Sequence, residues 1–175
     1  DPRAGFFSGY VNDAVATEAA WAGGWFHTGD VVIQDETGML FFVERRKTLT
    51  RRRGENIPAA EIEEAIIPHP AVAATAVIAV MDELRDEEPM ACIVLAAGRE
   101  RSWATAEEIF NFSPGLLAQH KLPGWIAFVE EIPVTPTQKV RRDAMFPHGE
   151  DPRRQPHVHD TRALKQAAKQ PQHAH

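Results

Sequence analysis

Three short segments of this sequence carry residue types that could do chemistry. In the first, the carboxylate of Asp30 follows Gly29 and precedes an apolar run. A carboxylate accepts hydrogen bonds through two oxygens, so Asp30 could bind two neighbouring hydroxyls, such as a ribose diol. An aspartate that caps a turn is the commoner explanation. The segment by itself leaves both interpretations open.

The second segment is a basic run, residues 45–53, which holds six cations in nine residues. Such a run would suit phosphate or nucleic acid, although a solvated charged hairpin is the commoner case. No aromatic residues alternate with the cations, which disfavours base stacking on a single strand. The chain has a formal net charge of -6, so we predict no nucleic-acid partner.

The third segment is the proline- and threonine-rich stretch 133–142, which contains Lys139. A lysine in such a loop is normally just exposed. Nothing in the local sequence distinguishes Lys139 from Lys121 or Lys165. Taken alone, this segment is a weak signal.

The elements that would position these residues begin with an aromatic and glycine-rich stretch, residues 1–43. A helix is predicted from position 12 or 13, where Asn and Asp are good caps, to Trp21. Two β-rich runs, 31–33 and 39–43, flank a turn that contains Asp and Gly, which predicts a hairpin.

Residues 44–146 predict a small α+β domain, in which helices cover a three-stranded sheet. Asn56 is the predicted cap of a helix that ends before Pro68. A second helix is predicted over 104–120, interrupted by Pro114. The predicted strands are 75–80, 91–96 and 125–129.

Residues 147–175 differ in composition from the rest of the chain. They hold five of the eight histidines and few apolar residues, which predicts a mostly disordered tail. The histidine pairs at 157/159 and 173/175 could bind a metal ion, but a solvated tail is the commoner explanation, so we predict no metal site.

The length of 175 residues allows one ordinary domain, or a small domain with appendages. No apolar run approaches the ~20 residues that a membrane-spanning helix needs. The sequence begins at Asp1 without an initiator methionine, which is typical of the middle of a longer chain.

The order of the three segments is more informative than each alone. From about Gly9 to Met145, the chain resembles the C-terminal third of an adenylate-forming (AMP-dependent) acyl-CoA synthetase. Carnitine- or crotonobetaine-CoA ligases look most similar. The resemblance rests on five motifs in register: Gly9-Tyr10 with Ala16-Thr17-Glu18-Ala19, Gly24-Trp25-Phe26-His27-Thr28-Gly29-Asp30, Phe42-Val43-Glu44-Arg45-Arg46-Lys47, Gly54-Glu55-Asn56-Ile57 with Glu61-Ile62-Glu63, and Lys121-Leu122-Pro123 with the Lys139 loop.

This resemblance implies a two-step ligase. A carboxylic acid attacks Mg-ATP to give an acyl-adenylate, and the thiol of CoA then displaces AMP. The small C-terminal domain acts as a lid with one pose for each step. Lys139 is then the catalytic residue of adenylation, while Asp30 and Arg45 bind the ribose or phosphate of ATP.

The remaining roles concern the lid and its surroundings. By the same resemblance, Gly54 and Glu55 lie on the loop that faces the CoA path, and Lys47 is the hinge. ATP, the acid and CoA would bind with a large N-terminal domain, of which residues 1–43 are the end. Its phosphate loop and acyl pocket are not in this sequence, so we predict that the chain alone is inactive. The resemblance also implies a cytoplasmic enzyme and allows a homodimer.

Three departures from the family pattern bear on this expectation. Arg53 stands where a glycine is usual, Thr48 where an acidic residue is common, and Gln138 where a glycine usually precedes the catalytic lysine. They weaken the expectation of CoA use more than that of adenylation. Two alternatives therefore stay open: a non-catalytic interaction module derived from the lid fold, or an adenylation domain with an acceptor other than CoA.

Overall fold

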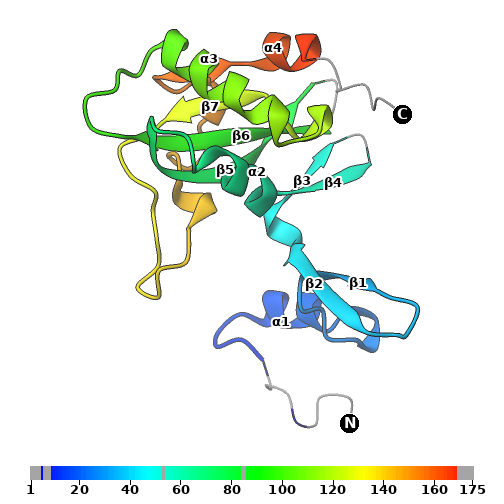
Figure 1. Ribbon diagram of the computed structural model, residues 1–175. Coiled ribbons are helices and arrows are strands. Elements are labelled where there is room, and N and C mark those ends of the chain that lie inside the picture. Colours follow the sequence, from blue (N-terminus) through cyan, green and yellow to red (C-terminus); the bar gives the residue numbers. More distant parts are fainter. Residues whose placement is uncertain (1–4, 6–8, 53, 84–85, 169–175) are drawn as a thin grey trace. The chain divides into compact units, whose positions relative to one another are not determined.

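The computed structural model describes residues 5, 9–52, 54–83 and 86–168 (Figure 1). The chain forms two compact units, Asp1–Lys47 and Thr48–His175, which are called unit 1 and unit 2 below. The boundary between them follows Lys47, whereas the sequence placed it after residue 43. Strand β2 (Leu40–Arg45) runs past that point and leads into a 3-10 turn, η2 (Arg46–Thr48).

Unit 1 contains the predicted helix and the predicted hairpin. Helix α1 (Ala14–Ala20) begins after Asp13, whose side chain accepts a hydrogen bond of 2.8 Å from the Ala16 amide. A 3-10 turn, η1 (Ala22–Gly24), follows. Strand β1 (Asp30–Gln34) pairs antiparallel with β2. Asp35 closes the turn between them, because its Oδ1 accepts the amides of Thr37 and Met39. Both predictions are confirmed.

Unit 2 is built on a sheet of six strands, and its α+β class agrees with the prediction. The strand order is β4-β3-β6-β7-β8, with β5 paired to β6; β6 and β7 are parallel. The three predicted strands correspond to β5, β6 and β7. The strands are β3 (Leu49–Arg52), β4 (Glu55–Pro58), β5 (Val72–Asp82), β6 (Asp86–Leu95), β7 (Trp125–Phe128) and β8 (Val158–Asp160).

Two helices cover one face of this sheet. Helix α2 (Ala59–Ile66) and helix α3 (Trp103–Phe112) contribute Ile62, Ile66 and Phe110 to a core in which Ile93 of β6 is also fully buried. The opposite face packs Met90 and Cys92 with side chains from the segment after β7. Burial of each such apolar side chain stabilises the fold by about 1.5–3 kcal/mol.

Two details differ from the predicted helices. Helix α2 begins at Ala59 with Pro58 as its N-cap, so Asn56 is not the cap; it lies in β4 and pairs with Arg51 of β3. Proline at 58 favours an extended residue before it, which suits a strand. Helix α3 ends at Phe112 and continues as 3-10 turns, η3 (Ser113–Gly115) and η4 (Gln119–Lys121), as the interruption at Pro114 indicated.

Residues 147–175 were predicted to be mostly disordered. In the structure, this segment has ordered elements up to residue 168. Turns η5 (Arg142–Ala144) and η6 (Pro152–Arg154) lead to β8, which pairs with β7, and to helix α4 (Arg162–Ala167). The segment is anchored by buried polar contacts, a property that apolar composition does not report: Thr161 Oγ1 donates to the Pro123 carbonyl at 2.9 Å. The histidine pair at 173/175 lies outside the described residues. Within the described ranges, no helix is long and apolar enough to cross a bilayer.

Candidate functional site

Asp30 and Arg45 face each other across the hairpin of unit 1. They are paired residues in the register of β1 and β2, and Arg45 Nε lies 2.7 Å from Asp30 Oδ1. The Arg45 guanidinium also donates to the Thr28 carbonyl at 2.9 Å. The Thr28 hydroxyl in turn accepts the Asp30 amide at 3.1 Å. These contacts fix a partly exposed carboxylate beside an exposed cation, a pairing suited to hydroxyl and phosphate groups.

Lys47 lies in the turn η2, at the boundary between the two units. The turn has three residues, Arg46–Thr48, and it connects β2 of unit 1 to β3 of unit 2. A hinge is a short connection whose few residues absorb a change of backbone angles. The position of Lys47 is consistent with the hinge that the sequence predicts for it.

Gly54 and Glu55 lie at the tip of the β3–β4 hairpin. Arg52 and Glu55 are paired in the register, and Gly54 lies in the turn between them. Gly54 has φ +83°, a conformation that residues with a side chain rarely adopt. Apart from its chain neighbours, no atom of the described residues lies within 4 Å of where its Cβ would be. The Glu55 carboxylate is 3.5 Å from His120 Nε2. At Gly54, the hairpin therefore has backbone that no side chain of that residue covers.

Lys139 begins the returning arm of a small hairpin loop in unit 2. Val134 and Val140 form a bridge, and the Thr135 amide donates to the Lys139 carbonyl at 2.8 Å. The Thr135 hydroxyl accepts the Lys139 amide at 3.0 Å. Gln138, immediately before the lysine, has φ 61°. The loop thus fixes the Lys139 backbone while the residue itself is exposed.

The structure therefore brings together some predicted site residues and separates others. Asp30 lies with Arg45 in unit 1, and Gly54 with Glu55 at one hairpin of unit 2. The Lys139 loop and the β3–β4 hairpin extend from different sides of unit 2 (Figure 1). Sequence reasoning missed Thr135, whose hydroxyl shapes the lysine loop; a threonine four residues before the lysine was its one signal.

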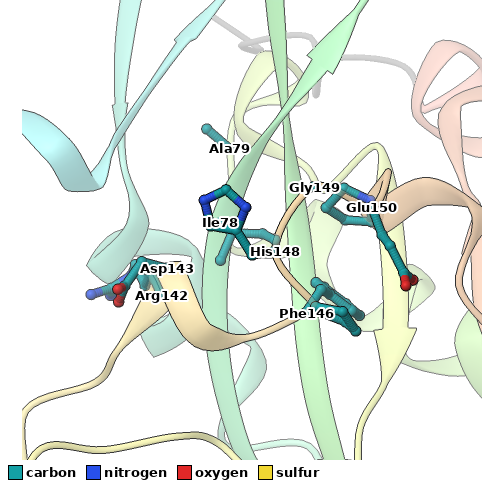
Figure 2. Close-up of a pocket in the computed structure, with 10 residues that line it drawn as sticks. Ile78, Ala79, Arg142, Asp143, Phe146, His148, Gly149 and Glu150 are labelled. Carbon is teal, nitrogen blue, oxygen red and sulfur yellow. The ribbon is translucent and has the colours of Figure 1, made fainter.

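An open pocket of about 260 Å³ lies elsewhere on unit 2. Figure 2 shows it between β5, which contributes Ile78 and Ala79, and the segment after the lysine loop, which contributes Phe146 and His148. None of the predicted site residues lines it. Its Arg142 is engaged, because the guanidinium donates to the Val77 carbonyl at 2.9 Å and to Glu63 at 2.7 Å.

The chain is similar to known proteins over most of its length. Residues 61–139 match the family described as the AMP-binding enzyme C-terminal domain. The 2-succinylbenzoate–CoA ligase of Bacillus cereus is 38% identical over 134 residues, which are 77% of this chain and 27% of that protein. A crotonobetaine/carnitine–CoA ligase of Escherichia fergusonii is 34% identical over 136 residues, 78% of this chain and 26% of that protein.

A solved structure has a similar fold. The o-succinylbenzoate–CoA synthetase of Bacillus subtilis, in complex with its acyl-adenylate intermediate, matches 82% of this chain and 29% of its own chain, with a TM-score of 0.64 and 30% identity. Residues 61–139 of unit 2 thus match the C-terminal domain of AMP-binding enzymes. The chain is related to acyl-CoA ligases, and it spans about a quarter of the length of the relatives it matches.

Proposed function

We propose that this chain is the C-terminal part of an ATP-dependent acid–thiol ligase, which forms an acyl-CoA through an acyl-adenylate. One observation carries the proposal. The Lys139 loop and the Gly54 hairpin extend from different sides of unit 2, and a three-residue turn joins this unit to the Asp30–Arg45 pair. A domain that carries two such loops and rotates about one short turn can present a different loop in each of two successive half-reactions.

In the adenylation step, Lys139 acts as a preorganised cation. The acid attacks the α-phosphate of Mg-ATP, which supplies pyrophosphate as the leaving group. Negative charge builds on the carboxylate and phosphate oxygens, and the fixed loop backbone aims the exposed ammonium at them. Stabilisation of this kind is worth roughly 10²–10³ in rate. Asp30 binds the ribose hydroxyls, and Arg45 keeps that carboxylate in place while it contacts the ribose or phosphate.

In the thiol step, the Gly54 hairpin lines the path of CoA. A pantetheine arm is narrow and must pass close to protein backbone. The left-handed conformation of Gly54 and its lack of a side chain permit that approach. Glu55 adjoins the same path, and Lys47 absorbs the rotation that exchanges one loop for the other.

Unit 1 has an exposed apolar surface that fits this proposal. The side chains of Ile33, Phe41 and Phe42 in the hairpin are each more than half exposed. Ile33 and Phe41 are partners in the register and share one face of the hairpin, and Phe42 lies on the other face. Exposed apolar side chains that gather on a face usually mark an interface with other protein. We propose that residues 1–43 belong to the large substrate-binding domain of the ligase, in the cytoplasm, and that the 175-residue chain alone is inactive.

A chimera tests the proposal. The segment of the Bacillus cereus ligase that matches this chain would be replaced by the chain, and two products would be followed. Pyrophosphate release from 2-succinylbenzoate and ATP reports adenylation, and thioester formation from synthetic adenylate reports the thiol step. We expect both activities from the chimera and neither from the chain alone. A folded chimera that releases no pyrophosphate would contradict the proposal.

Two substitutions in the chimera separate the half-reactions. Lys139→Ala should slow pyrophosphate release at least ~10²-fold and leave the thiol step nearly unchanged. Lys121→Ala is the matched control, because this lysine pairs with Glu61 away from the loop. Lys47→Pro should give the opposite pattern, since a fixed φ at the hinge hinders the rotation. Equal slowing of both steps by Lys139→Ala would mean that the lysine is structural. A chimera that adenylates but forms no thioester would favour an acceptor other than CoA.

A further inference from the structure

Glu88 is a fully buried carboxylate that none of the proposed catalytic steps uses. It lies in β6 with 0% of its surface exposed. Its two oxygens contact two different cations: Oε1 accepts from Arg52 Nε at 2.6 Å, and Oε2 accepts from Lys165 Nζ at 2.6 Å. Lys165 is itself 3% exposed. A buried ion is costly unless it is paired and hydrogen-bonded. Glu88 and its two cations therefore hold one another in place.

The two cations come from distant parts of the chain. Arg52 is the last residue of β3, two positions before Gly54. Lys165 lies in α4, in the segment 158–168, which we call the C-terminal segment. Glu88 therefore links this segment to the turn end of the β3–β4 hairpin, next to Gly54.

The C-terminal segment is itself firmly held, so it can serve as the fixed end of this link. Its strand β8 pairs with β7, and Thr161 donates to the Pro123 carbonyl. Arg162 lies 3.0 Å from the buried carboxylate of Asp82. The Gln119 side chain donates to the Lys165 carbonyl at 3.0 Å. These contacts fix the backbone from which Lys165 reaches Glu88.

At the hairpin end of this link, β3 pairs with β6 over a short stretch. Among the described residues, which leave out 53, 84 and 85, strand β3 pairs with β6 at one residue pair, Arg52 with Asp86. The side chains of β6 add two contacts at this place: Glu87 accepts the Arg51 amide at 2.7 Å, and Glu88 accepts from Arg52. A hairpin with few ladder bonds to its sheet depends strongly on such side-chain contacts.

We propose that the C-terminal segment braces the Gly54 hairpin through Lys165 and Glu88, and thereby supports the thiol half-reaction selectively. Lys165 is a positioning residue: it acts on the hairpin through Glu88 and touches no substrate. The Lys139 loop lies on another side of unit 2, so the brace leaves adenylation unaffected. The mechanical part of this inference stands on the contacts alone, whereas its catalytic consequence rests on the proposed function.

Hydrogen exchange on the 175-residue chain tests the mechanical part. Lys165→Met removes the ammonium and keeps the length of the side chain. We expect the amides of β3 and β4 to exchange at least ~10-fold faster, with smaller changes in β5. Lys121→Met is the control, because it makes the same substitution at a more exposed ion pair. An equal change in all strands, or none in the hairpin, would overturn the brace.

A second variant removes the other cation that contacts Glu88. If circular dichroism finds Lys165→Met unfolded, Arg52→Met gives the same readout, since Lys165 still pairs with Glu88. Arg162→Met in the same segment removes the contact with Asp82 and leaves the Glu88 contacts intact. If it loosens the hairpin as much as Lys165→Met does, docking of the segment in general is responsible and the proposed link is refuted.

The chimera tests the catalytic consequence. Lys165→Met should slow thioester formation several-fold, leave pyrophosphate release unchanged, and be rescued in part by Lys165→Arg. Equal slowing of both steps would refute selective support. A chimera with no activity at all contradicts the proposed function and leaves the exchange result intact, whereas an unchanged hairpin overturns the brace even in an active chimera.

Discussion

Gly124→Ala is a small change that probes how rigidly Glu88 is held. Gly124 has no positive φ, so alanine meets no backbone obstacle there. The added Cβ would lie 2.9 Å from Glu88 Oε2 and 3.3 Å from both Glu88 Cβ and Arg162 Cγ. A carboxylate at the end of a free side chain could turn away. This one is held by Arg52 and Lys165, each at 2.6 Å, so relief requires breaking a buried ionic contact.

The expected cost follows from two opposing effects. Overpacking at a site that cannot relax destabilises by about 1–3 kcal/mol. Alanine in place of glycine stabilises by about 0.4–1 kcal/mol, because the unfolded chain loses conformational freedom. The net expectation for Gly124→Ala is a loss of about 1–2 kcal/mol. With a denaturant slope of about 1.5 kcal/mol per molar urea, the midpoint falls by roughly 1 M.

Gly115→Ala is the matched control for this measurement. Gly115 also lacks a positive φ. Apart from its chain neighbours and the backbone of its own turn, no atom of the described residues lies within 4 Å of its Cβ position. Equilibrium urea unfolding of both variants, followed by tryptophan fluorescence, should separate them. Gly115→Ala should be neutral or slightly stabilising, with the same slope. If Gly124→Ala is as stable as Gly115→Ala, Glu88 can move freely, and the rigidity that underlies the brace is refuted.

Three further predictions concern ligands and pH. Calorimetry should find weak ATP binding by the 175-residue chain, because the proposed function gives it few nucleotide contacts, those of Asp30, Arg45 and Lys139; micromolar affinity would contradict this. Gel shifts at about 150 mM salt, where the Debye length is about 8 Å, should find no submicromolar binding to DNA or RNA; tight, salt-sensitive binding would be the contrary result. Burial lowers the pKa of His159, so the unfolded chain binds that proton first, and stability should fall as pH drops below the ordinary value of 6.5. His159→Phe should flatten urea-midpoint profiles between about pH 7 and 5, whereas His148→Asn, an exposed control, should not; an unchanged slope would show that His159 is not responsible.

The elements that sequence predicts best are those whose signal is local. Asp13 caps α1 because its side chain bonds an amide three residues ahead, and spacing alone reveals this. The hairpin of unit 1 follows from two β-rich runs and the turn at Asp35. The strand β3 was missed, because Arg51 and Arg52 are charged and the run is only four residues long. Strand β3 pairs with β4 and β6, and no local pattern in residues 49–52 indicates which strands it pairs with.

The C-terminal segment was missed for a related reason. Its composition is polar, and polarity normally indicates that too little apolar surface is available for folding. Here the polar groups are themselves the anchor: Lys165 pairs with a carboxylate 77 positions away in the sequence. Such a contact depends on the whole fold, so it is visible in coordinates and not in periodicity.

In the candidate site too, some features follow from local sequence and others only from the fold. Gln138 is the clearest case. The sequence presents this residue as a departure from the glycine usual before the catalytic lysine, which puts the loop in doubt. In the structure, Gln138 has φ 61° and closes a three-residue hairpin loop, at the position where a left-handed residue is required. Glycine is favoured there because other residues pay about 1–2 kcal/mol for that conformation. The bonds between Thr135 and Lys139 offset that cost, so the loop closes with glutamine at this position and the Lys139 backbone is held in place.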